Sequence, residues 1–160
     1  MQVSLNKNKG FTLIEILTVL VILMVLGGVF YTVFVTNWFA FEDRITRSNL
    51  WHEANEIIET ITADGRFAQT IDVFTDGTGN KSAVLNDSLN QPVATYLITA
   101  DGRFQMNKSG VVKTLSDNLN AVQSGFTKQG RGLRVQLALE ELILKRIIHV
   151  GTSTEIFPRN

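Results

Sequence analysis

Lys-Gly-Phe-Thr-Leu-Ile-Glu, from Lys9 to Glu15, stands directly before an uncharged apolar run from Ile16 to Val35. As an α-helix the 20 residues of this run extend about 30 Å, the thickness of the hydrocarbon core of a bilayer. Glu15 is the only charged residue between Lys9 and Glu42. Because a carboxylate is costly in lipid, Glu15 requires either a position near the membrane surface or a partner. The sequence therefore predicts a membrane-spanning helix with one unusual carboxylate near its start.

A polar leader of ten residues precedes this stretch and carries two positive charges, Lys7 and Lys9. A common secretory signal peptide has an apolar core of about 7–15 residues and a small-x-small cleavage site. The apolar run here is longer, and its last part, Phe30 to Val35, contains no such site. Lysines before the span and acidic residues after it predict a single-pass membrane protein with its amino terminus in the cytoplasm and its carboxy-terminal domain on the other side of the membrane.

The run from Gly10 to Glu15 behind a short basic leader resembles the class III signal of type IV prepilins and type II secretion pseudopilins. The resemblance implies cleavage between Gly10 and Phe11 by a prepilin peptidase/methyltransferase, followed by N-methylation of Phe11. Glu15 is implied to act in assembly, paired with the terminal amine of a neighbouring subunit. The implied partners are the peptidase, other pilins or pseudopilins, an inner-membrane assembly platform and the membrane itself.

This resemblance leads us to expect a minor subunit of a type II secretion pseudopilus or a type IV pilus. It implies a precursor anchored in the inner membrane with its carboxy-terminal domain in the periplasm, placed finally in a periplasmic or surface filament. An aromatic strand with Tyr96, a small hairpin, a final strand pair and the terminal Arg159-Asn160 are similar to J-type minor pseudopilins and W-type minor pilins. Those chains commonly end in Leu-Arg-Asn, whereas this chain has Pro158 before Arg159. The alternative is an uncleaved, single-span anchored protein whose periplasmic domain binds a ligand or adhesion partner.

One long helix is predicted from Phe11 to about Ala68, because proline occurs only at positions 92 and 158. Beyond the span, apolar residues recur mostly three or four positions apart, as on one face of an amphipathic helix: Phe34, Trp38, Phe41, Ile45, Leu50, Ala54, Ile57 or Ile58, and Ile61. Trp38 is placed as an aromatic anchor at the membrane surface, and Trp51 is expected in the core or the apolar stripe.

The predicted organisation is α+β and pilin-like, with a long spine helix packed on a small antiparallel sheet. We divide it into a leader (1–10), a transmembrane and assembly helix (11–36), an amphipathic continuation of that helix (37–68) and a loop-and-sheet domain (69–160). Gly27-Gly28 is a soft point within the span, because each glycine costs about 0.5–1 kcal/mol relative to alanine. One interpretation is that this glycine pair allows close helix packing or local unwinding in a filament. The other is that the pair is simply tolerated in a helix that lipid stabilises.

A heptapeptide, Ile-Thr-Ala-Asp-Gly-Arg-Phe, occurs at Ile61–Phe67 and again at Ile98–Phe104. We expect the first copy to end or weaken the long helix at Gly65. The second is expected to be a hairpin turn, because Asp101-Gly102 separates two strand-like segments, Val93–Thr99 and Arg103–Asn107.

The segment from Asp72 to Pro92 is expected to be a loop with a short strand at Ala83–Leu85. Its polar residues favour turns for backbone reasons, and their spacing differs from that of a calcium loop: Asp76, Asn80, Asp87 and Asn90. The carboxy-terminal part is predicted as strands, which are Ala121–Lys128, Leu133–Glu140, Lys145–Val150 and Thr154–Phe157. A helix over Leu137–Ile148 is the alternative.

Composition gives no indication of catalysis. Lysine plus arginine equals aspartate plus glutamate at 15 each, so no nucleic acid partner is expected. The chain has no cysteine and hence no disulfides. His52 and His149 lack metal-ligand spacing, and the sequence has no nucleophile elbow, phosphate loop or dinucleotide fingerprint. We therefore expect a protein that is not an enzyme and has no catalytic residues, metal site or cofactor.

Overall fold

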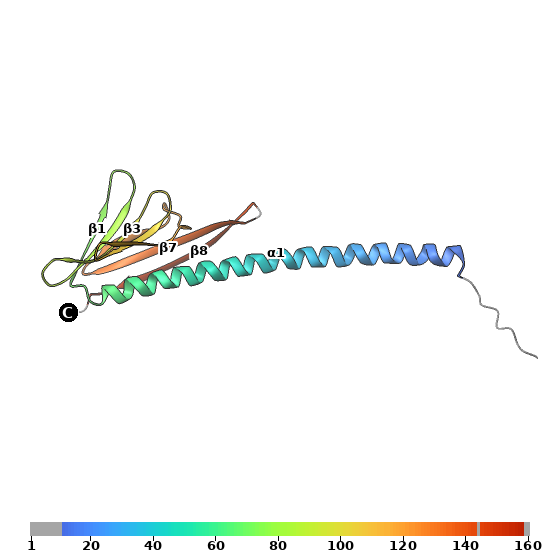
Figure 1. The fold of residues 1–160 in the computed structure, drawn as a ribbon, viewed down its shortest axis with the longest axis horizontal. Helices are drawn as coiled ribbons and strands as arrows, with labels where there is room; N and C mark the ends of the chain where they lie inside the picture. Colours follow the sequence, from blue (N-terminus) through green and yellow to red (C-terminus); the bar gives the residue numbers. More distant parts are fainter. Residues whose placement is uncertain (1–10, 144, 159–160) are drawn as a thin grey trace, which may run out of the picture. The chain divides into compact units, whose positions relative to one another are not determined.

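The computed structural model describes residues 11–143 and 145–158, and within them one α-helix is followed by eight β-strands (Figure 1). The helix is α1 (Leu13–Gly65). Five strands form sheet A and three form sheet B, and all neighbouring strands are antiparallel. The predicted α+β fold, a long N-terminal helix packed on antiparallel strands, is therefore confirmed. The strands form two sheets where a single small sheet was expected.

In both sheets each strand pairs with the next one along the chain. Sheet A has the order β1 (Thr70–Thr75), β2 (Lys81–Asn86), β3 (Pro92–Ile98), β4 (Phe104–Lys108) and β5 (Val111–Ser116). Sheet B has the order β6 (Gly125–Gln129), β7 (Gly132–Ile143) and β8 (Arg146–Ile156). Such meanders need only short turns, several of which contain a residue with positive φ: Gly79, Asn90, Gly102, Gly110, Gly130 and Lys145.

The chain divides into two compact units, the first ending at Glu42 and the second beginning at Asp43, so α1 contributes to both. In the first unit every described residue from Phe11 to Phe34 is exposed. An 18-residue window of α1 has a mean hydropathy of 2.7, and none of it is buried. Exposed apolar surface of this size marks contact with a membrane or with other proteins, which agrees with the predicted span.

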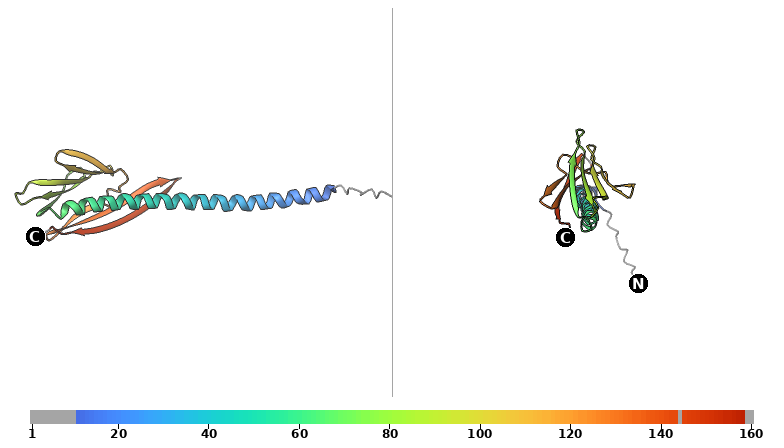
Figure 2. Two further views of the ribbon diagram at one scale, coloured as in Figure 1. Left: turned by 60° about the horizontal axis from the view of Figure 1, so that its bottom comes forward. Right: turned by 90° about the vertical axis from the view of Figure 1, so that its left-hand side faces the viewer.

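The core of the second unit lies between the later part of α1 and the two sheets (Figure 2). Leu50, Ala54, Ile57 and Ile61 are at most 1% exposed, as their spacing of three or four residues predicts. The expectation for Trp51 was wrong, because this side chain is 42% exposed. One position after Leu50, it is turned by about 100° around the helix and so leaves the buried face.

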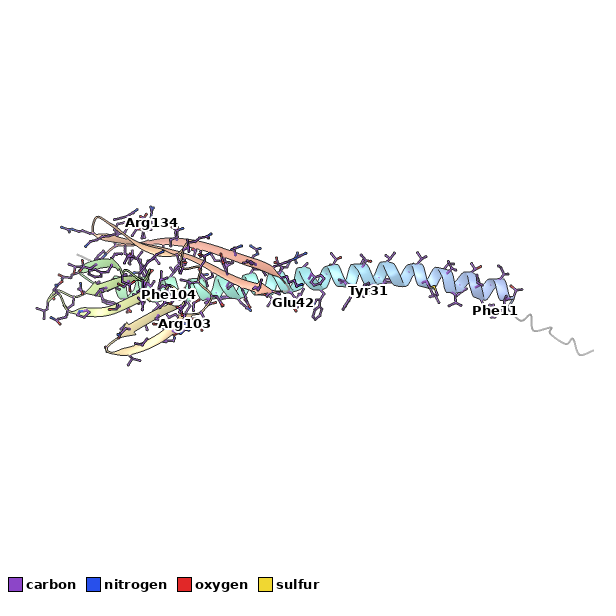
Figure 3. All side chains as sticks on the ribbon, turned by 90° about the horizontal axis from the view of Figure 1, so that it is seen from above. Phe11, Tyr31, Glu42, Arg103, Phe104 and Arg134 are labelled. Carbon is purple, nitrogen blue, oxygen red and sulfur yellow. The ribbon has the colours of Figure 1, made fainter. Side chains whose placement is uncertain are left out.

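Three aromatic rings join the two sheets. The Tyr96 and Phe104 ring centroids are 6.0 Å apart, and those of Phe104 and Phe126 are also 6.0 Å apart. The last pair meets edge to face, which is a favoured geometry for aromatic rings. Phe104, labelled in Figure 3, is fully buried. Strands β3 and β4 of sheet A are thereby packed on β6 of sheet B.

The segment predicted as a loop from Asp72 to Pro92 is instead mainly the β1–β2 hairpin. Residues 83–85 are a strand, as expected, but they belong to the longer β2. Asp76 accepts hydrogen bonds from the backbone amides of Thr78 and Asn80, both at 2.9 Å, and so organises the turn between the strands. The polar residues of this segment gather in two short turns, and that composition concealed the strands between them.

Two predictions for the carboxy-terminal strands are also corrected. Strand β6 begins at Gly125, because the side chain of Asn120 accepts hydrogen bonds from the amides of Val122 and Gln123 and holds that segment in a turn. Strand β8 is continuous from Arg146 to Ile156, where two separate strands were expected. The alternative helix over 137–148 is wrong, since the described part of this range belongs to β7, β8 and their turn.

The two copies of the heptapeptide adopt different structures, as predicted. The first continues α1 to Gly65, and the second forms the turn between β3 and β4. Asp64 is buried whereas its counterpart Asp101 is exposed. The phenylalanines show the reverse, with Phe67 78% exposed and Phe104 fully buried. Surrounding structure therefore decides the conformation of this sequence.

Candidate processing and assembly site

Helix α1 begins with a reciprocal pair of hydrogen bonds between Thr12 and Glu15. The backbone amide of Thr12 donates to Oε2 of Glu15 at 3.0 Å, and the amide of Glu15 donates to the hydroxyl of Thr12 at 3.3 Å. The Thr12 hydroxyl also donates to Oε2 of Glu15, at 3.0 Å. This is a capping box, which satisfies amide donors that the first helical turn leaves without partners.

The capping box gives the unusual carboxylate a partner within its own chain. Negative charge at a helix amino terminus is further stabilised by the helix dipole. Only Oε2 takes part in these bonds, and among residues 11–143 and 145–158 no donor reaches Oε1. Within this part of the chain, Oε1 of Glu15 therefore has no hydrogen-bond donor.

The other residues of the predicted site lie at or before this helix start. Phe11 precedes α1 and is 84% exposed (Figure 3). It borders a shallow recess of mostly apolar lining formed by Phe11, Glu15, Ile16, Val19 and Leu20. Gly10 and the leader lysines, Lys7 and Lys9, lie outside the described residues. The structure therefore brings Phe11 and Glu15 to one end of the apolar helix.

Three threonine hydroxyls along the span are bonded within the helix itself. The hydroxyls of Thr18, Thr32 and Thr36 donate to the carbonyl oxygens of Ile14, Gly28 and Thr32 at 2.8, 2.9 and 2.9 Å, respectively. Such bonds remove the cost of placing hydroxyl groups in lipid. Around Gly27 and Gly28 a Cβ atom would meet nothing within 4 Å, so nothing inside the chain requires glycine there.

A second polar cluster, which sequence reasoning missed, closes the other end of α1. Asp64, 8% exposed, accepts a 2.7 Å hydrogen bond from the Tyr96 hydroxyl and a 2.6 Å bond from Nζ of Lys108. Burial raises the pKa of the Tyr96 phenol, and the bond to Asp64 raises it further. A signal existed in the sequence, because Asp64 continues the buried stripe three residues after Ile61.

Two of the other polar residues considered in the sequence, His149 and Asp76, have structural partners. Nδ1 of His149 lies 2.8 Å from Oε1 of Glu140 across β7 and β8, and His52 is exposed on α1. Hydrogen bonds from Thr78 and Asn80 lower the pKa of Asp76 to about 2. Within the described part of the chain no three His, Cys, Asp or Glu side chains are grouped so as to hold a metal ion.

The apolar helix with a capping box at its start, continued into an α+β domain, gives the chain a pilin-like architecture, and the length and composition of the helix fit a membrane anchor. Residues 5–31 match the family model of the prokaryotic N-terminal methylation motif. The match covers the second part of the leader, Phe11, Glu15 and most of the span, and it supports a pilin or pseudopilin that prepilin peptidase processes. Searches of curated proteins and of solved structures found no match to the chain.

Proposed function

We propose that this chain is a minor pilin or pseudopilin, cleaved between Gly10 and Phe11, methylated on Phe11 and assembled into a type II secretion pseudopilus or a type IV pilus. The observation that carries the proposal is the match of residues 5–31 to the methylation motif, which includes the first part of an exposed apolar helix. The protein acts as a structural subunit and is a substrate of enzymes rather than an enzyme.

Assembly replaces lipid around the helix with the helices of other subunits. The described side chains from Phe11 to Phe34 are all exposed in the single chain, so the whole surface is available for this packing. When the subunit enters the filament, Oε2 of Glu15 is bonded to Thr12. Its Oε1 then accepts a hydrogen bond from the methylated amine of a neighbouring subunit. A paired charge is tolerated in a low-dielectric environment, whereas an unpaired one is costly.

Within the family, we place the chain closest to J-type minor pseudopilins and W-type minor pilins. Support comes from Tyr96 in the central strand β3, the β3–β4 hairpin and the final β7–β8 pair. The partners in this function are the prepilin peptidase, an inner-membrane assembly platform and other pilins or pseudopilins. The precursor is held in the inner membrane, and the mature subunit becomes part of a periplasmic or surface filament.

Mass spectrometry of the amino terminus tests the processing step. We expect a chain that begins with methylated Phe11, and Gly10→Val should block cleavage because a small residue is needed at the cleavage site. Asn8→Val, two residues away in the leader, is the matched control and should be processed. An intact Met1 in the wild-type protein would show an uncleaved membrane-anchored protein and overturn the proposal.

Filament entry tests the role of Glu15 separately. Glu15→Val should be cleaved normally yet be strongly depleted from sheared filaments, because the neighbouring amine loses its partner. Glu42→Val, which changes the next carboxylate along α1, is the control and should assemble. Normal incorporation of the Glu15 variant would remove the pairing role while leaving the processing step intact.

A further inference from the structure

The tip of the hairpin formed by β7 and β8 carries exposed apolar and basic side chains, which packing within sheet B does not require. Its outward face bears polar or small cross-strand pairs along most of its length: Arg134–Glu155, Gln136–Ser153, Ala138–Gly151 and Glu140–His149. The next pair on this face is Leu142–Ile147, whose side chains are 70% and 56% exposed. The polar pattern of a solvated sheet face thus ends at the tip.

Two cations accompany this exposed apolar pair. Lys145 lies in the turn, with a φ of 66°, and Arg146 begins β8 directly after it, and both are exposed. We call Leu142, Ile143, Lys145, Arg146 and Ile147 the hairpin tip. The nearest acidic residues along β7, Glu140 and Glu141, lie further from the turn. Glu140 is bonded to His149 and to the side-chain amide of Asn120, at 2.8 and 2.7 Å.

The lengths of α1 and β8 place this tip at the end of the unit where the chain enters. A Cβ on Gly65 would lie 2.5 Å from Cγ2 of Ile156, so the end of α1 and the end of β8 are in contact. From there β8 runs back ten residues to Arg146, about 33 Å. Alongside it (Figure 2), α1 runs back 22 residues from Gly65 to Asp43, also about 33 Å.

The entry point is close along the chain to the apolar span. Eight residues separate Val35 from Asp43, which is about 12 Å of α-helix. A bilayer extends roughly 5–7 Å beyond its hydrocarbon core on each side, and its surface potential acts over about a Debye length, near 8–10 Å. The chain between the span and Asp43 is therefore short enough to allow the long side chains of Lys145 and Arg146 to reach headgroups.

We propose that the hairpin tip docks on anionic phospholipid headgroups of the membrane that holds the anchor. Basic side chains next to exposed aliphatic ones match an anionic headgroup region above hydrocarbon. A second copy of the chain fits less well, since two exposed apolar side chains fall far short of the 1,200–2,000 Å² of a stable protein interface. Docking gives the subunit a second contact with the membrane before its anchor helix leaves the bilayer. This docking does not depend on cleavage at Gly10.

Because the chain has no cysteine, single cysteines can report the position of the tip in the full-length protein. Leu142→Cys and a matched control, Gln136→Cys, lie on the same strand and face, about 20 Å apart. Each is labelled with a fluorophore, and the protein is reconstituted in vesicles that contain a headgroup-attached quencher. The vesicles contain either phosphatidylglycerol or only phosphatidylcholine.

Docking predicts strong quenching at position 142 in phosphatidylglycerol vesicles, and little at position 136 or in phosphatidylcholine. Lys145→Ala with Arg146→Ala should lower the docked-to-free ratio by roughly five-fold for each charge removed. Lys113→Ala with Lys128→Ala removes the same charge elsewhere on the domain and should have little effect. Equal quenching at position 142 in both lipids would overturn the proposal. So would quenching that depends on protein density rather than lipid charge, since the tip would then contact another copy.

Discussion

The hydroxyl of Tyr96 donates a 2.7 Å hydrogen bond to Oδ2 of Asp64, which ties the central strand of sheet A to the last turn of α1. Lys108 from β4 holds the other carboxylate oxygen at 2.6 Å. The helix therefore ends on a buried polar contact that also fixes its rotation against the sheet. In a core that is otherwise mainly apolar, such a contact is directional and specifies one packing arrangement.

Removing this carboxylate should destabilise the second unit. Asp64→Ala leaves the buried Tyr96 hydroxyl with only the more distant carbonyl oxygen of Thr60, 3.4 Å away, as acceptor, and Lys108 without the carboxylate, which costs about 1–3 kcal/mol of unfolding free energy. Thermal unfolding of the full chain in detergent, followed by near-UV circular dichroism, measures the change. Asp101→Ala in the other copy of the heptapeptide is the matched control and should cost less than about 1 kcal/mol, because Asp101 forms only exposed contacts.

Tyr96 should also make the unit sensitive to alkali. Its pKa is raised in the folded state, mainly by burial, so the folded protein holds this proton more tightly than the unfolded chain. Stability from this group is then fully present below the usual tyrosine pKa of about 10 and is lost as the pH rises above that value. Phenolate absorbance should show Tyr96 ionising together with unfolding, and Tyr96→Phe should remove that signal. Ionisation of Tyr96 near pH 10 in the folded protein would contradict this.

The turn between β3 and β4 should depend on glycine at position 102. Gly102 has a φ of 86°, and a Cβ there would collide with the carbonyl oxygen of Leu119. Gly102→Ala should therefore cost clearly more than Gly110→Ala, where φ is 82° but the surrounding space is open. For Gly110→Ala we expect about 1 kcal/mol from backbone strain alone. Equal unfolding temperatures of the two variants would show that the contact with Leu119 is easily relieved.

Replacing Gly27 and Gly28 together by alanine should leave insertion and folding unchanged. Nothing in the chain lies within 4 Å of the added methyl groups, and alanine favours a helix by about 0.5–1 kcal/mol per site. Membrane fractionation and the unfolding temperature of the second unit check this expectation. Filament entry of the same variant then measures contacts with other subunits: unchanged entry assigns the glycines no role in assembly.

The helix and its buried stripe could be predicted because their signals are local and repeated. Apolar spacing placed Leu50, Ala54 and Ile61 in the core, and the same spacing should have identified Asp64 as a buried carboxylate. Its partners could not be found this way, because Tyr96 and Lys108 come from strands 32 and 44 residues further along the chain. Only the packing of the helix on sheet A brings these three side chains together.

The strands of sheet A were harder to predict than the helix. Strand β5 (Val111–Ser116) was not anticipated, because most of its residues are exposed and it lacks the alternation of a half-buried strand. Strand β1 was hidden in a segment whose composition resembles a loop. At the candidate site, Phe11 and Glu15 were recognised from sequence, but the capping box with Thr12 became evident only from the geometry of the helix start.

The duplicated heptapeptide has a practical consequence for immunochemistry. An antibody raised against Ile-Thr-Ala-Asp-Gly-Arg-Phe would find two copies of its epitope in the denatured chain. In the native protein one copy is the end of a helix with an exposed Phe67, and the other is a hairpin turn with a buried Phe104. The ratio of native to denatured binding would therefore report unfolding of the domain without any label.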